Sequence, residues 1–185
     1  TLIPMDLTQK NHLKAYGIAH FVLNQGIEVD WLLNYKGGSF MFKYNKVFES
    51  ECVIRGVSYE IVADVQYSKI IQDISSPELN MDVVKLEKIP KIAVYSPKTK
   101  QPWDDAVTLA LAYAEIPYDV IFDKEVLQDN VLPKYDWLHL HHEDFTGQYG
   151  KFYRAYHNAA WYIEQVMEFL DLSSIIGFQK VSLMM

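Results

Sequence analysis

Three imidazoles and two carboxylates fall within one short run of this sequence, His139-Leu140-His141-His142-Glu143-Asp144. Imidazole and carboxylate groups bind zinc and iron, and alternate residues of a strand face one side, so His139 and His141 could share a divalent metal ion. The alternative is a metal-free polar strand end whose side chains hydrogen-bond neighbouring loops or transfer protons at a bound ligand. We favour this alternative, expect no cofactor, and predict His141, His142 and Glu143 as catalytic residues.

A second group of polar residues precedes a predicted helix that begins near Pro102. Lys98 and Thr99 lie just before this helix, and a helix N-terminus with nearby lysines attracts carboxylate or phosphate. Trp103 offers a stacking wall for a ligand. Asp104 is either half of an acid–base pair with its neighbour or a charge that complements the helix dipole. The spacing matches no phosphate-binding loop, because no Gly-x-x-x-x-Gly-Lys-Ser/Thr run is present.

Asp6 and Thr8 form a third polar group, in the loop that follows the first predicted strand. Thr8 is predicted to be a helix N-cap. Ligands bind outside the carboxyl ends of parallel strands, where the loops of residues 5–10, 96–101 and 141–150 are expected to meet. The sequence therefore predicts one cleft that binds a small molecule.

Hydrophobic periodicity predicts two βαβ units, one in each half of the chain (about 1–75 and 85–185). Thr8 corresponds to Thr99 and Asp30 to Asp119 at a nearly constant offset, which indicates either two related halves or two generic βαβ units in one sheet. We expect a single α/β domain, or the N-terminal part of a longer protein, with a mostly parallel sheet. The predicted strands are 2–5, 27–33, 91–95, 116–121 and 135–141, and the predicted helices are 11–25, 102–114 and 152–170.

The segment between the two units is predicted to contain short strands at 40–44, 52–54 and 59–62 and a helix at 68–74. The single cysteine, Cys52, lies in an apolar run without the glycine-flanked turn of a nucleophile elbow. We therefore expect Cys52 to be a core thiol.

Composition excludes several classes of protein. Half of the residues are hydrophobic and 22% are charged, which is typical of a globular domain and not of a disordered chain. The net charge of −7 argues against nucleic acid and anionic membrane surfaces as partners. No apolar run approaches the roughly 18 residues of a membrane-spanning helix. We expect Thr1 to be a processed or engineered start and the natural protein to continue beyond Met185.

Several long runs of the sequence, residues 2–6, 8–17, 31–35, 37–40, 100–106 and 135–152, carry a resemblance to a known family. They resemble a bacterial family labelled asparagine synthetase B. The resemblance implies a flavodoxin-like sandwich of the class I glutamine amidotransferase type, in a longer chain whose nucleophile lies beyond this sequence. It also implies an exported or periplasmic protein, with a cytoplasmic location as the alternative.

The family label does not by itself fix an enzymatic mechanism. Glutamine-dependent asparagine synthetases have an N-terminal cysteine and a Ser-Gly-Gly-x-Asp-Ser loop that binds ATP, whereas this sequence begins with Thr1 and contains no such loop. Our first expectation is a domain that binds a small polar metabolite or acts as a hydrolase or amidotransferase. The alternatives are part of a glutamine-dependent asparagine synthetase and a non-catalytic sugar-binding or scaffolding module.

Overall fold

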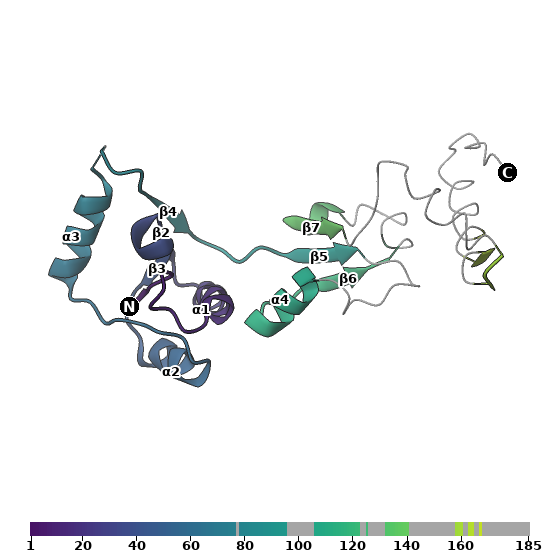
Figure 1. Cartoon of the computed structure of the whole chain (residues 1–185), viewed down its shortest axis with the longest axis horizontal. Helices are drawn as coiled ribbons and strands as arrows, with labels where there is room; N and C mark the ends of the chain where they lie inside the picture. Colours follow the sequence, from purple (N-terminus) through teal and green to yellow (C-terminus); the bar gives the residue numbers. More distant parts are fainter. Residues whose placement is uncertain are drawn as a thin grey trace. The chain divides into compact units, whose positions relative to one another are not determined.

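The computed structural model of the chain describes residues 1–76, 78–95, 106–122, 125, 132–140, 158–160, 163–164 and 167 (Figure 1). The chain divides into two compact units. The first unit comprises Thr1–Pro90 with Leu109–Pro117, and the second comprises Lys91–Thr108 with Tyr118–Met185.

The first unit contains a four-stranded sheet in the order β1-β3-β2-β4. Every pair of neighbouring strands in this sheet is antiparallel. Since β1 and β2 are both antiparallel to β3, β1 and β2 run in the same direction with β3 between them. The helix α1 (His12–Asn24) connects β1 to β2, so this is a split βαβ unit. The strands are β1 (Leu2–Ile3), β2 (Val29–Leu33), β3 (Ser39–Phe42) and β4 (Asp82–Leu86).

This arrangement corrects the prediction of one mostly parallel sheet. The first predicted strand, β1, lies in this antiparallel sheet. The strands predicted at 91–95, 116–121 and 135–141 form a separate sheet. The tight 3-10 turn η1 (Tyr35–Gly37) returns the chain as a hairpin and inserts β3 between β1 and β2. A two-residue side-chain period is the same in parallel and antiparallel strands, so the sequence pattern did not reveal this insertion.

Helices cover both faces of the first sheet. On one face, α1 and α2 (Lys46–Ile54) pack over a buried cluster that includes Ile18 and Phe40. On the other face, α3 (Asp64–Ile74) packs over Leu32 and Met41, and Figure 1 shows α3 and α1 on opposite sides of the strands. The first unit is therefore a three-layer α/β/α arrangement.

Asn11 caps the start of α1, because its side chain accepts a hydrogen bond from the backbone N–H of Lys14 at 3.2 Å. The prediction that Thr8 caps this helix is wrong, because its hydroxyl instead donates to Asp6. The predicted end is confirmed, since Gly26 adopts φ +73° just after the C-cap residue. The core side of α1 includes Ala15, Ile18, Ala19 and Val22, whereas Leu13 and Tyr16 are 43% and 45% exposed.

Three elements between the halves differ from the sequence predictions. Residues 52–54 form the end of α2 and not a strand, because Asn45 caps a helix by accepting from the N–H of Val47 at 2.9 Å. Residues 59–62 contribute only a bridge between Glu60 and Leu2. The strand β4 was not predicted. By contrast, Cys52 is fully buried, as expected of a core thiol, and the predicted helix at 68–74 lies within α3.

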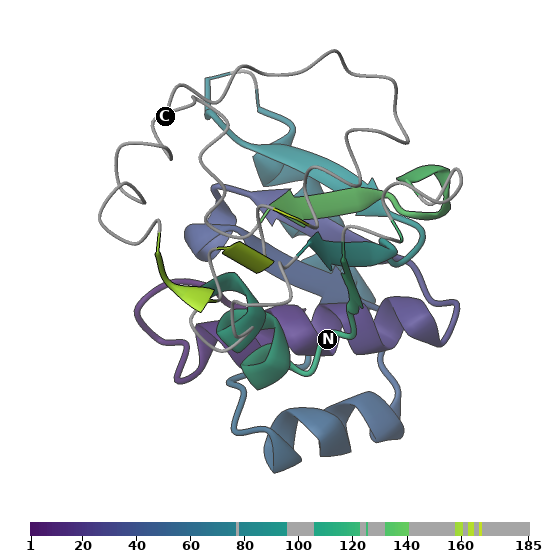
Figure 2. The same ribbon diagram turned by 90° about the vertical axis from the view of Figure 1, so that its right-hand side faces the viewer.

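The second unit contains a three-stranded parallel sheet in the order β6-β5-β7 (Figure 2). The strands β5 (Ile92–Tyr95) and β6 (Asp119–Ile121) are joined through α4 (Ala106–Ala114), which confirms the βαβ unit predicted here. The predicted parallel pairing of β5 with β7 (Trp137–Leu140) is also confirmed. A short 3-10 turn, η3 (Leu132–Lys134), precedes β7.

The end of α4 packs within the first unit. Glu115 follows the helix with φ +61° and forms ion pairs with Lys14 and Arg55. An L-residue with a side chain is disfavoured in this conformation, so these ion pairs help to hold Glu115 in place.

Among the described residues, no helix is long and apolar enough to cross a membrane.

Candidate functional site

Two loops meet at one edge of the first sheet. Because β1 and β2 run in the same direction, the loops that follow them, residues 4–11 and 34–38, lie at the same edge. The backbone N–H of Met5 donates to the carbonyl of Lys36 at 2.9 Å. A Cβ atom placed on Gly37 would lie only 2.5 Å from the carbonyl oxygen of Met5. We call this region the β1–β2 edge site and define it by Asp6, Thr8, His12, Lys36 and Glu60.

The first loop of the site is held by a buried amide. Gln9 is 5% exposed, and its Nε2 donates to the carbonyls of Pro4 at 2.8 Å and Ser58 at 3.1 Å. Its Oε1 accepts from the backbone N–H groups of Ser58 at 2.8 Å and Asn11 at 3.2 Å. All the hydrogen-bonding capacity of this amide is used inside the protein, so Gln9 is a structural anchor that fixes the loop.

The carboxylate of Asp6 closes a turn above this anchor. Its Oδ1 accepts from the hydroxyl of Thr8 at 2.6 Å and from the backbone N–H of Thr8 at 3.0 Å. The pKa of Asp6 lies below its ordinary value, and the hydrogen bond from the hydroxyl of Thr8 is the largest cause. The hydrogen bond from the backbone N–H of Thr8 and the charges of Lys36 and His12 lower this pKa further. Asp6 is therefore a carboxylate at neutral pH, and its Oδ2 accepts no hydrogen bond from the residues that the structure describes.

The second loop has an unusual backbone. Asn34, Lys36, Gly37 and Gly38 all have positive φ angles, of 61°, 43°, 80° and 92°. A non-glycine residue in this conformation costs about 1–2 kcal/mol and persists only when the surroundings hold it. Here the hydroxyl of buried Ser39 donates to the carbonyl of Tyr35 at 2.9 Å, among other contacts. Such over-determined strain is characteristic of functional loops.

Two further side chains complete the site. The ammonium of Lys36 forms an ion pair with Glu60 at 2.7 Å, and this hydrogen bond raises the pKa of Lys36. The Nε2 of His12 lies 3.1 Å from the carbonyl oxygen of Met5 and 3.2 Å from that of Asp6. Because a carbonyl only accepts, Nε2 must carry a hydrogen, which leaves Nδ1 of a neutral His12 as an acceptor.

The structure tests only part of the predicted cleft. Asp6 and Thr8 are brought together, as hydrogen-bonded partners. His139 lies on β7 in the second unit, where its ring meets that of Trp137 with centroids 6.4 Å apart. The other predicted site residues fall outside the described residues: Lys98, Thr99, Trp103, Asp104, His141, His142 and Glu143.

Sequence reasoning missed His12, Lys36 and Glu60 as members of the site. The run Asn34-Tyr35-Lys36-Gly37-Gly38 carried a signal, since paired glycines beside an asparagine indicate left-handed backbone. Glu60 carried no local signal, because only its bridge to Leu2 brings it to this edge.

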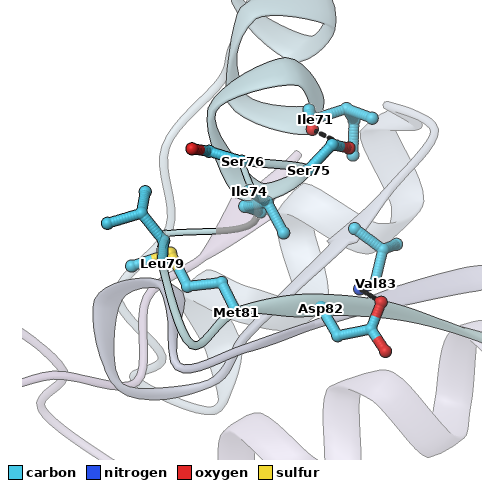
Figure 3. Close-up of a pocket in the computed structure, with 8 residues that line it drawn as sticks. All are labelled: Ile71, Ile74, Ser75, Ser76, Leu79, Met81, Asp82 and Val83. Carbon is cyan, nitrogen blue, oxygen red and sulfur yellow. Dashed lines mark hydrogen bonds between the residues drawn. The ribbon is translucent and has the colours of Figure 1, made fainter.

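A separate pocket of about 490 Å³ lies between the end of α3 and the beginning of β4 (Figure 3). Apolar side chains and the polar groups of Ser75, Ser76 and Asp82 line it together, and the hydroxyl of Ser75 donates to the carbonyl of Ile71 at 2.7 Å. Its lining offers no acid–base pair for catalysis. The lining residues are Ile71, Ile74, Ser75, Ser76, Leu79, Met81, Asp82 and Val83.

Two other chemical possibilities find no support in the described part of the chain. No group of three or more His, Cys, Asp and Glu side chains there could hold a metal ion. Burial raises the pKa of the Cys52 thiol to about 11, so the thiol is protonated and inaccessible. Neither a metal centre nor a cysteine nucleophile can therefore be built from these residues.

No protein-family model, no curated protein and no solved structure matches this chain. The functional assignment therefore rests on the geometry of the β1–β2 edge site and on the sequence motifs.

Proposed function

We propose that the first unit binds a small polar metabolite at the β1–β2 edge site, in a protein of the family labelled asparagine synthetase B. The observation that carries this proposal is the left-handed backbone of residues 34–38, which is held against the carbonyl of Met5. The same turn returns the chain from β2 to β3, and it presents Lys36 beside the turn of Asp6 and Thr8.

The charges of the site favour a ligand that carries an ammonium group. Asp6 and Glu60 are carboxylates and Lys36 is a cation already paired with Glu60, so these three side chains leave one negative charge uncompensated. The Oδ2 of Asp6 is the free acceptor for that ammonium. A charge-assisted hydrogen bond of this kind contributes about 1.5–3 kcal/mol. Amino acids are the simplest small polar metabolites with this chemistry.

The proposal assigns binding to the first unit and leaves proton transfer to other residues. Within the described residues, no nucleophile lies beside a base, since Cys52 is buried and protonated. We assign hydrolase or amidotransferase chemistry to His141, His142 and Glu143. An exported or periplasmic location is part of the same family-based proposal.

Isothermal titration of the chain with L-asparagine, L-aspartate and L-glutamine tests the proposal. The Asp6→Asn variant removes the charge but keeps an acceptor for Thr8, so it should weaken binding about tenfold or more without changing the loop. Asp64→Asn removes the same charge at the exposed start of α3 and should leave binding unchanged. Absence of binding to all three amino acids, or equal effects of the two variants, would show that the edge site is not the ligand site.

A further inference from the structure

The end of α4 packs closely on one side of α1. The carbonyl oxygen of Ala114 lies so near Gly17 that a Cβ atom added to Gly17 would overlap it. The hydroxyl of Tyr113 accepts a hydrogen bond from Nδ2 of Asn11 at 2.7 Å. Residues 109–117 are therefore docked on α1, at a position where α1 carries a glycine and has no room for a side chain.

Two ion pairs hold Glu115 at the end of this docked segment. One of its carboxylate oxygens pairs with Lys14 of α1, and the other lies 3.1 Å from Nη2 of Arg55, the residue that ends α2. The Nε of Arg55 also pairs with Glu51 of α2 at 3.0 Å. The Arg55 side chain is only 11% exposed, so a largely buried guanidinium joins α2 to the end of α4.

Two buried nitrogen atoms at this junction have no hydrogen-bond partner among the described residues. They are Nη1 of Arg55 and Nε2 of His20. Nη1 lies 3.5 Å from the position of an added Cβ on Gly17, and His20 follows Gly17 by three residues, so both belong to the same side of α1. Burying a polar group without a partner costs free energy, and burying an unpaired charge costs more. The docked arrangement therefore favours a neutral His20.

The charge of Arg55 opposes a second cation beside it. Burial lowers the pKa of His20 below its ordinary value of 6.5, and the positive charge of Arg55 lowers it further. The hydrogen bond from Lys14 lowers the pKa of Glu115 below its ordinary value of 4.5. As the pH falls from about 6.5 toward 4.5, protons therefore begin to bind His20 while Glu115 keeps its charge.

The neighbouring carboxylates do not compensate a charge on His20. Glu51 is already paired with Arg55, and Glu115 with both Arg55 and Lys14. His20 itself forms no ion pair with any residue that the structure describes. The titratable groups of the three packed elements nearest the junction are Lys14 and Tyr16 of α1, Glu51, Cys52 and Arg55 of α2, and Tyr113 and Glu115 at the end of α4.

We propose that the end of α4 is an acid-sensitive latch on α1, in which a proton bound by His20 releases residues 109–117 from α1 and α2. A neutral His20 lets Arg55 remain buried and hold Glu115. A proton on His20 places two cations together where neither has water, and release of residues 109–117 hydrates both. The docked state is thus most stable above about pH 6.5 and loses stability as the pH falls.

Hydrogen exchange of the whole chain at pH 7.5 and 5.0, expressed as protection relative to the intrinsic rate at each pH, tests the latch. We expect the protection of residues 109–117 to fall roughly fivefold or more at pH 5.0, because a short helix end that is released from its contacts frays. The same residues should be clearly less protected than β2 and β3 at pH 5.0, since release leaves the sheet folded.

Three variants separate the latch from general effects of acid. His20→Gln keeps a polar side chain but takes up no proton, so the protection of residues 109–117 should change by less than about twofold between the two pH values. His139→Gln removes an imidazole from β7 of the second unit and should keep the full response. Glu115→Gln weakens both ion pairs, so residues 109–117 should be less protected already at pH 7.5.

The protection of β2 and β3 shows whether each variant is folded, and His20→Leu replaces His20→Gln if the glutamine variant is not. Three results would overturn the proposal. One is equal protection of residues 109–117 at pH 7.5 and 5.0 in the unchanged protein. Another is the same fall in the His20 variant as in the unchanged protein. The third is equal protection of residues 109–117 and of β2 and β3 at pH 5.0, since the segment would then open only when the whole unit unfolds.

Discussion

Replacing Gly37 by alanine tests the close approach of the two loops that form the β1–β2 edge site. Gly37 has φ +80°, and an added Cβ would lie 2.5 Å from the oxygen and 2.6 Å from the carbon of the Met5 carbonyl. It would also lie 2.8 Å from the backbone nitrogen of Asp6. All three atoms belong to the backbone, so no side-chain rotation can relieve the clash, and one loop must move.

The expected magnitude has two parts. Placing alanine in the left-handed region costs about 1–2 kcal/mol, and forcing extra volume into a packed region costs about 1–3 kcal/mol. Gly26→Ala isolates the first part, because Gly26 has φ +73° and an added Cβ meets nothing within 4 Å. We therefore expect a loss of stability of about 1–2 kcal/mol for Gly26→Ala and about 2–5 kcal/mol for Gly37→Ala.

Native-state hydrogen exchange over β1, β2 and β3 measures this difference, because it reports on the opening of the first unit by itself. Gly37→Ala should also weaken amino-acid binding, whereas Gly26→Ala should not. If the two variants lose the same stability to within about 0.5 kcal/mol, the backbone of residues 34–38 does not approach Met5 as described. The two loops would then not form the β1–β2 edge site.

Two further predictions concern buried groups of the first unit. Burial, with a smaller effect of Arg55, lowers the pKa of His20 below 6.5, so between the two pKa values the unfolded chain binds more protons than the folded one. The free energy of unfolding should therefore fall as the pH drops below about 6.5. Urea unfolding at pH 7.5 and 5.5 measures this loss, and the loss should be smaller in His20→Leu. The same pH dependence in His20→Leu and the unchanged protein would contradict this role of His20. Cys52 is fully buried with a pKa of about 11, so Ellman's reagent at pH 8 should label it only after urea unfolds the chain, and rapid labelling of the folded chain would refute its burial.

Several local elements could be predicted from the sequence because their signals are local. The helix predicted at 102–114 contains α4 (Ala106–Ala114) and ends at the same residue, while residues 102–105 lie outside the described residues. The left-handed Gly26 ended α1 as expected, and the strands β5, β6 and β7 lie within their predicted ranges. Short apolar runs were less decisive, and residues 52–54 form part of a helix because the cap at Asn45 outweighs their β-branched character.

The candidate site was only half visible in the sequence. Asp6 and Thr8 stood out as polar residues after a strand, but their relation to each other was misread as helix capping. Lys36 reaches the site through the hydrogen bond from Met5 to its carbonyl, and Glu60 reaches it through the bridge to Leu2. Both contacts join segments that are far apart in the chain, so no local sequence pattern predicts them.

The sequence by itself determined which segments are helices and strands in most of the described chain, and it determined the α/β class. Only the tertiary structure decided that β3 enters between β1 and β2 and that the described strands form two sheets. The physical reason is that side-chain periodicity depends on a few neighbouring residues, whereas strand direction and order depend on hydrogen bonds between distant ones. The left-handed turn at residues 34–38 is a local feature that sets a distant contact, because it returns the chain so that β3 pairs with β2.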